Sequence, residues 1–138
     1  MDTSFLISLY SPDANSIAAA QIMQVSKSTH LVSTFTELER INALEMRVFR
    51  KEISSAQAKS SLRDFEKDVS RGVFQLTRLP EEAFQRAQQI SLRTTARLGT
   101  RTADLLHVAA ALELNVDYLY SFDRQQRKLA QRLQMKVN

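Results

Sequence analysis

The sequence contains no cysteine, no tryptophan, and only two glycines and two prolines in 138 residues. Without cysteine, the chain can form neither a disulfide framework nor a thiolate metal site. Few helix-breaking residues predict long helices joined by short turns. No apolar run is long enough to cross a bilayer, and the N-terminal MDTSFLISLY lacks the basic flank and long apolar stretch of a signal peptide. These absences predict a cytoplasmic protein that has no contact with membranes.

The composition is that of an ordinary globular protein in which basic residues outnumber acidic ones. Hydrophobic residues make up 43% and charged residues 25%, and the length favours one domain with a substantial core. Lysine and arginine number 19 against 15 acidic residues, for a net charge of +4. This excess favours encounters with a polyanion such as nucleic acid.

Short apolar segments alternate with longer helical patterns along the chain. The apolar, β-branched segments predict strands at 30–34, 73–79, 117–121 and 135–137. The helical patterns cover 5–10, 13–26, 36–51, 54–70, a segment beginning at Pro80, 102–114 with Thr102 as N-cap and Asn115 as its end, and 123–133. Such alternation predicts an α/β fold in which helices flank a short, mainly parallel sheet.

The helix predicted at 36–51 is amphipathic. At 100° per residue its apolar side chains fall on one arc (Phe35, Leu38, Ile41, Val48 and Phe49) and three cations fall opposite (Arg40, Arg47 and Lys51). The next helix carries an apolar stripe of Leu62, Phe65 and Val69. Core packing and a groove for a partner helix explain these stripes equally well.

Acidic residues stand at four predicted helix starts: Asp2, the pair Glu37 and Glu39, Asp104, and Asp123. Each one taken singly is explained as a cap or first-turn residue that complements the helix dipole. If the acids converge, however, their repulsion requires a neutralising cation. Oxygen ligands without cysteine suit Mg²⁺ or Mn²⁺.

Four motifs in this order, DTSFL, TELERINAL, TADLLHVAAAL and YLYSFDRQQRKLA, resemble the PIN-domain ribonucleases of the VapC toxin type. The resemblance implies a single PIN-like domain over 1–138, a three-layer α/β/α arrangement, and cleavage of RNA with one or two Mg²⁺ or Mn²⁺ ions. It also implies a cognate antitoxin and a homodimer. Because the family places several strand residues before its first acid and only Met1 stands there in this sequence, the first strand is expected to be truncated.

Carried over by motif, the catalytic acids are Asp2, Glu39, Asp104 and Asp123, and the metal ligands are Asp2, Asp104 and Asp123. The second acid is chosen from two candidates. The family places a small residue four positions after this glutamate; Glu39 is followed there by Ala43, whereas Glu37 is followed by Ile41.

Other side chains receive supporting roles. Hydroxyls at Ser4 and Ser121 are expected either to orient a carboxylate or metal-bound water, or to form a cap or turn. Basic residues near the acids are expected to meet RNA, or to form a solvated face: Arg101, Arg124, Arg127 and Lys128. His30 and His107 lie in apolar surroundings and are expected to be packing residues.

The leading hypothesis is therefore a metal-dependent endoribonuclease, the toxin of a toxin–antitoxin pair. One alternative is a catalytically inactive PIN-like module that binds RNA or protein. Another is a plain helical interaction domain whose acids act only as caps.

Overall fold

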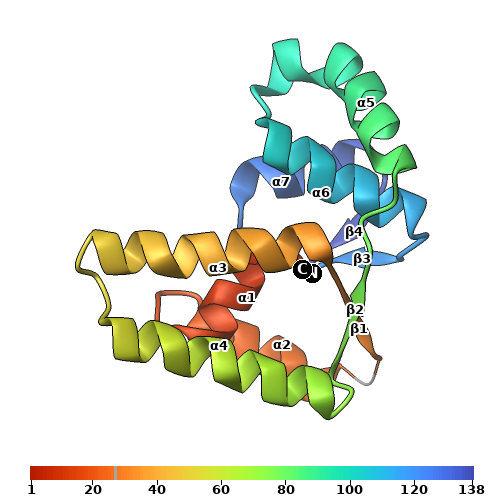
Figure 1. The fold of residues 1–138 in the computed structure, drawn as a ribbon. Coiled ribbons are helices and arrows are strands. Elements are labelled where there is room, and N and C mark those ends of the chain that lie inside the picture. The colour runs from red at the N-terminus through yellow and green to blue at the C-terminus, as the bar shows by residue number, and fades with distance from the viewer. Residues whose placement is uncertain (27) are drawn as a thin grey trace. The chain divides into compact units, whose positions relative to one another are not determined.

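The computed structural model describes residues 1–26 and 28–138. Within these residues the chain forms seven helices and four short strands (Figure 1), in the order α1 (Thr3–Tyr10), α2 (Ser16–Val25), β1 (His30–Ser33), α3 (Thr34–Phe49), α4 (Ser55–Ser70), β2 (Phe74–Thr77), α5 (Glu82–Leu98), α6 (Thr102–Glu113), β3 (Tyr118–Leu119), α7 (Arg124–Arg132) and β4 (Lys136–Val137). The predicted α/β class with parallel strands is confirmed. The described residues group into two compact units, one made of residue 1 and residues 3–77, the other of residue 2 and residues 78–138.

The first unit is built on the parallel pair β1 and β2, in which His30 lies opposite Phe74 and Ser33 opposite Thr77. The apolar core combines Leu6, Val32, Phe65 and Phe74, all at most 2% exposed. These residues come from α1, β1, α4 and β2, so two short strands and two helices share one core. The core explains why strands of only four residues are stable in this unit.

Helix α4 follows its predicted pattern. It begins with a capping box, in which the Ser54 hydroxyl accepts from the Gln57 amide and the Gln57 side chain accepts from the Ser54 amide. Phe65 is buried, and its ring meets that of Tyr10 edge to face at 5.7 Å between centroids. The apolar stripe of this helix therefore faces the core.

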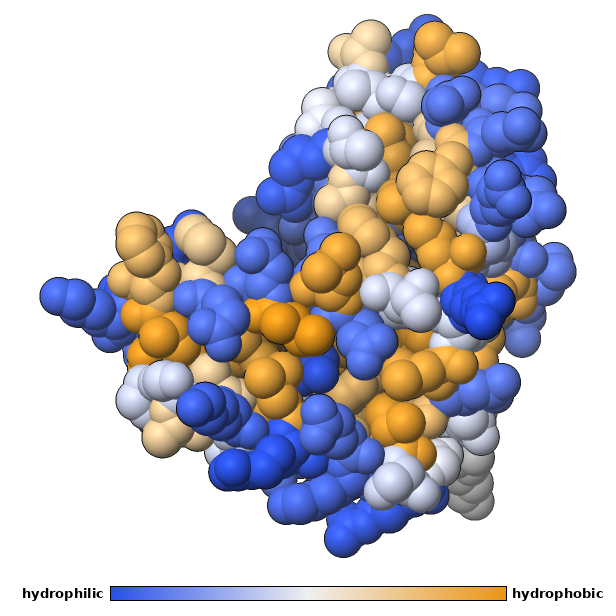
Figure 2. Space-filling view, viewed as in Figure 1, coloured by the Kyte–Doolittle hydropathy of each residue, from blue (hydrophilic) through white to orange (hydrophobic). Residues whose placement is uncertain are grey.

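Helix α3 contradicts the core-packing interpretation of its apolar arc. Leu38 is 63% exposed and Phe49 is 79% exposed, whereas Arg40 on the opposite face is only 2% exposed. The Arg40 guanidinium lies 4.1 Å from the centroid of the Phe65 ring, and burial lowers its pKa. Apolar surface is visible over α3 in Figure 2.

The second unit packs α5 and α7 against α6, with β3 and β4 as a two-residue parallel pair. The helix α6 is buried on nearly all sides, and every residue from Asp104 to Ala111 is buried. Its alanines allow neighbouring helices to approach closely. A helix buried on all faces provides a rigid base for side chains at its N-terminus.

Several predicted boundaries move by a few residues. The strand β1 ends at Ser33 because its hydroxyl accepts from the Thr36 amide and starts α3. Helix α5 begins at Glu82 and not at Pro80, and the N-cap of α6 is Arg101 and not Thr102. Asn115 does adopt the left-handed conformation (φ 51°) just after α6.

The segment before the first acid contains no strand among the described residues, and α1 begins directly at Thr3. The ammonium group of Met1 donates to the Leu31 carbonyl at 2.8 Å, which fixes the chain end to β1. No described helix is long and apolar enough to span a membrane. The layer arrangement and the single domain stay predictions.

Candidate metal centre

Asp104 lies in the first turn of α6 and its side chain is 4% exposed. The backbone amide of Arg101 donates to its Oδ2 at 2.9 Å, as expected of an acid in a first turn. The Arg101 guanidinium adds two bonds, from Nε to Oδ2 at 3.2 Å and from Nη2 to Oδ1 at 3.1 Å. Both oxygens of this buried carboxylate therefore meet one cationic side chain.

Asp123 is the N-cap of α7, and its two oxygens have different partners. Oδ1 accepts from the amides of Gln125 at 2.8 Å and Gln126 at 3.1 Å, while Oδ2 accepts from Arg101 Nη2 at 2.6 Å. Burial raises the pKa of this carboxyl, but the bonds from Gln126, Gln125 and Arg101 outweigh burial and the net pKa is lowered. Asp123 is thus held ionised, with one oxygen directed to the helix and the other to a cation.

Asp2 is 2% exposed and is connected to Asp123 through Ser121. The Ser121 hydroxyl donates to Asp2 Oδ2 at 2.7 Å and accepts from the Asp123 amide at 3.0 Å. In addition, the Asp2 amide donates to the Tyr120 carbonyl at 3.0 Å. Ser121 is fully buried, so this link is shielded from water.

A continuous network therefore joins the three aspartates through Ser121 and Arg101. Because Arg101 Nη2 contacts Asp104 Oδ1 and Asp123 Oδ2, those two oxygens can be no further apart than the sum of the two bond lengths. The guanidinium acts as a stand-in for the positive charge that converging carboxylates require, and their proximity raises its pKa. All-oxygen donors of this kind fit Mg²⁺ or Mn²⁺.

The side chains are not arranged as a preformed metal cage. Among residues 1–26 and 28–138, no group of three or more histidine, aspartate or glutamate side chains is arranged to hold an ion. Arg101 takes the position between Asp104 and Asp123 instead. The donor chemistry fits a hard cation, and the present geometry fits a guanidinium.

Glu39 belongs to the first unit, where its Oε2 accepts from the Thr3 hydroxyl at 2.8 Å. Thr3 directly follows Asp2 in the chain, and sequence analysis assigned it no role. The signal was present in the motif DTSFL, in which a hydroxyl residue stands beside the first acid. The charge of Glu37, the other candidate, raises the pKa of the buried Arg40 and so opposes the effect of burial.

The remaining predicted residues lie as follows. Ser4 is in the first turn of α1, and its carbonyl accepts from the Ser8 hydroxyl. The basic residues of α7 are accessible: Arg124 and Lys128 are exposed and Arg127 is half-buried. Both histidines are buried, His30 at 5% and His107 at 6% exposure, as expected for packing residues.

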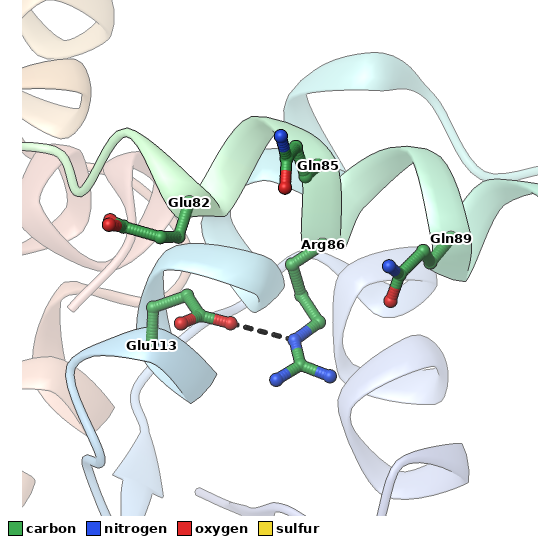
Figure 3. A pocket seen from close by; sticks show the side chains of 5 residues that line it. All are labelled: Glu82, Gln85, Arg86, Gln89 and Glu113. Carbon is green, nitrogen blue, oxygen red and sulfur yellow. Dashed lines mark hydrogen bonds and ion pairs between the residues drawn. The ribbon is translucent and has the colours of Figure 1, made fainter.

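A separate polar cleft of about 260 Å³ lies on the second unit, and none of the predicted site residues lines it (Figure 3). Its walls come from α5 and from the end of α6. Arg86 Nε donates to Glu113 Oε1 at 2.7 Å across the cleft, and Glu82, Gln85 and Gln89 complete the lining. The paired charges make this a solvated surface feature.

Comparison with known proteins agrees with these motifs. The chain superposes on the crystal structure of VapC20 from Mycobacterium tuberculosis, described as a toxin that cleaves the sarcin-ricin loop, with a TM-score of 0.71 and 17% sequence identity, over 92% of this chain and 91% of that one. No curated protein matches the sequence. A family model for the PIN domain matches residues 1–132. The chain belongs to the PIN domain family.

Proposed function

We propose that this protein is an endoribonuclease that hydrolyses RNA phosphodiester bonds with the help of Mg²⁺ or Mn²⁺, and that it is the toxin of a toxin–antitoxin pair. The observation that carries the proposal is the network joining Asp2, Asp104 and Asp123 through Ser121 and Arg101. Membership of the PIN family and the likeness to VapC20 support the same activity.

In this proposal Asp2, Asp104 and Asp123 hold the metal, and Glu39 is the fourth catalytic acid. The choice of Glu39 is supported by the bond from Thr3, the residue next to Asp2. A bound divalent ion supplies Lewis-acid stabilisation of the charge that develops on the phosphate. The protein supplies the carboxylates, and Ser121 orients the carboxylate of Asp2.

Positive charge on α7 is proposed to attract the substrate. Arg124 directly follows Asp123 and is exposed, and the half-buried Arg127 and the exposed Lys128 lie about one turn further along the same helix. Such side chains neutralise phosphates without reading the base sequence. Arg101 is the fourth basic residue proposed to meet RNA, in addition to its contacts with the acids.

Cleavage of RNA by the purified protein tests the proposal. We expect cleavage with Mn²⁺ or Mg²⁺, none with EDTA, and a loss of roughly 10²-fold or more in Asp104→Asn, since removing one electrostatic group from other active sites costs 10²–10³. A sarcin-ricin hairpin, taken from the description of VapC20, and an unstructured RNA make a suitable substrate pair.

Asp117→Asn is the matched control. Asp117 is an exposed aspartate of the same unit, and its substitution by asparagine removes the same charge. It is expected to cleave like the wild type. Cleavage that persists in EDTA, or an Asp104→Asn variant as active as this control, would overturn the nuclease proposal.

An inactive PIN module that binds RNA or protein is the second candidate. It is favoured by the ion pairs of Arg101, which satisfy Asp104 and Asp123 without a metal. In that case RNA binds in EDTA and in Mn²⁺ alike, and no cleavage occurs.

The proposals of a cognate antitoxin and of a homodimer are based on the resemblance to VapC toxins. The exposed apolar side chains of α3, among them Leu38, Ile41 and Phe49, support such a contact because they offer a helix face that the described residues leave accessible.

A further inference from the structure

Arg101 makes two kinds of contact that have different explanations. Its backbone amide bond to Asp104, three residues later, is ordinary helix-start geometry. Its guanidinium contact to Asp123 is different, since the two residues are 22 positions apart and the 2.6 Å bond joins the starts of two different helices. A side chain that is 68% exposed is therefore held over two carboxylates from separate helices.

The oxygens that Arg101 engages are those on which the proposed metal would depend. Asp123 Oδ1 is bonded to two α7 amides, so Oδ2 is the oxygen directed toward Arg101. The Arg101 guanidinium also donates to both oxygens of Asp104, from Nε to Oδ2 and from Nη2 to Oδ1. An Mg²⁺ or Mn²⁺ ion requires carboxylate oxygens at about 2.1 Å. A guanidinium nitrogen and an ion cannot both occupy that position, because they exclude each other by volume and repel by charge.

We infer that Arg101 is an internal counter-cation that competes with the divalent metal: it holds Asp104 and Asp123 together when no metal is bound and must leave them before the ion can bind. Its exposure allows the side chain to swing outward without disturbing packed residues. The exchange replaces one cation beside the buried Asp104 by another, so the carboxylate has a counter-charge both with and without the metal. This inference rests on the proposed metal-dependent function.

The arrangement has a direct consequence for metal affinity. Each bond from the Arg101 guanidinium to an acid must be broken before the ion binds, so the intact arginine weakens the apparent affinity. Because the guanidinium is largely exposed, its ion pairs are modest, and removing it should tighten metal binding by only about tenfold. Without metal, the same removal leaves the two carboxylates facing each other and destabilises the protein.

Calorimetric titration of Mn²⁺ into the full chain tests this inference. Arg101→Gln is expected to bind Mn²⁺ about tenfold more tightly than the wild type. Arg124→Gln is the matched control, because it removes the same charge beside Asp123 from an exposed side chain. Arg101→Lys, which keeps the charge but loses the planar fork, is expected to lie between the wild type and the glutamine variant.

Melting curves in EDTA and in Mn²⁺ provide a readout that does not depend on cleavage. Arg101→Gln should melt below the wild type in EDTA and gain more from Mn²⁺ than the wild type does. If the wild type binds Mn²⁺ and Arg101→Gln binds it no more tightly than Arg124→Gln does, the inference is overturned. Weaker binding by Arg101→Gln overturns it as well. Either result leaves the nuclease proposal intact. If none of these proteins binds Mn²⁺, both proposals fail.

Discussion

Asp123 shows that a helix cap can leave one carboxylate oxygen for a second partner. Its Oδ1 accepts from two amides at the start of α7, and its Oδ2 faces Arg101. A carboxylate has two oxygens, and the backbone amides that hold Oδ1 of Asp123 also fix the position of its Oδ2. The cap therefore contributes to the site by orienting the carboxylate.

Ser121 allows a prediction at the same scale. Its hydroxyl donates to Asp2 and accepts from the Asp123 amide while fully buried. Replacing it by alanine removes both bonds at once from groups that water reaches poorly. Ser121→Ala is therefore expected to lower the free energy of unfolding by about 1–3 kcal/mol, measured by urea denaturation.

Ser70→Ala is the control for this substitution. Ser70 is exposed, and its hydroxyl donates to the Lys67 carbonyl of its own helix. Its effect should stay within about 0.5 kcal/mol. An Ser121→Ala variant as stable as Ser70→Ala would show that the hydroxyl contributes nothing to the network.

At the scale of elements, the positions of the helices in the sequence were predictable, but the face that each helix buries was not always predictable. The capping box at Ser54 and the stripe through Phe65 indicated α4 correctly, because both signals are local. For α3 the apolar arc left core packing and a partner groove equally open, and in the structure Arg40 lies against Phe65 of another helix while Phe49 is exposed. Periodicity identifies two faces of a helix without deciding which one its neighbours cover.

For the candidate site, the sequence indicated some of the residues that lie together and missed others. The motifs supplied the aspartates, and the structure brings Asp2, Asp104 and Asp123 into one network. The bridging role of Arg101 was not predictable, because it depends on where Asp123 lies relative to the start of α6 in space. Thr3 was missed for the same reason, since its partner is 36 residues away.

The strand pair β1–β2 makes stability depend on pH through His30. This side chain is 5% exposed, at the start of β1, with its ring 6.2 Å from that of Phe74. Burial lowers the pKa of His30 below its usual 6.5, and the charge of the N-terminus lowers it further. The unfolded chain therefore binds a proton on His30 at a higher pH than the folded chain does, and stability should fall as the pH drops below about 6.5.

Comparing wild type with His30→Phe by urea denaturation at several pH values isolates this contribution. The variant keeps a ring against Phe74 and removes the titrating group, so part of the acid-side loss of stability should disappear. If both proteins lose stability in parallel below pH 6.5, His30 is not responsible.

At the scale of the whole molecule, the net charge of +4 bears on the proposed binding of RNA. The charge excess is small, so its distribution matters more than its total. Two of the three basic residues of α7 named as RNA contacts are exposed, and all three follow Asp123 within five positions. RNA binding should therefore depend on α7 more than on basic residues elsewhere.

Salt dependence of RNA binding tests this expectation. Neutralising Arg124, Arg127 and Lys128 together by glutamine should weaken binding and reduce the slope of log K against log salt by up to about 2, since each phosphate contact to single-stranded RNA contributes about 0.7. The measurement uses fluorescence anisotropy in EDTA, so that cleavage cannot interfere.

The control neutralises three exposed cations of the first unit, Arg50, Lys59 and Arg63, and so removes the same total charge. If the molecule attracted RNA only through its overall charge, the two triple variants would lose affinity and slope equally. If α7 provides the contacts, as we expect, the control keeps most of the wild-type slope because phosphates sense charges only within about 8–10 Å at moderate salt. Equal slopes would therefore remove α7 from the proposed RNA-binding surface and would leave the proposals on the acidic network to their own tests.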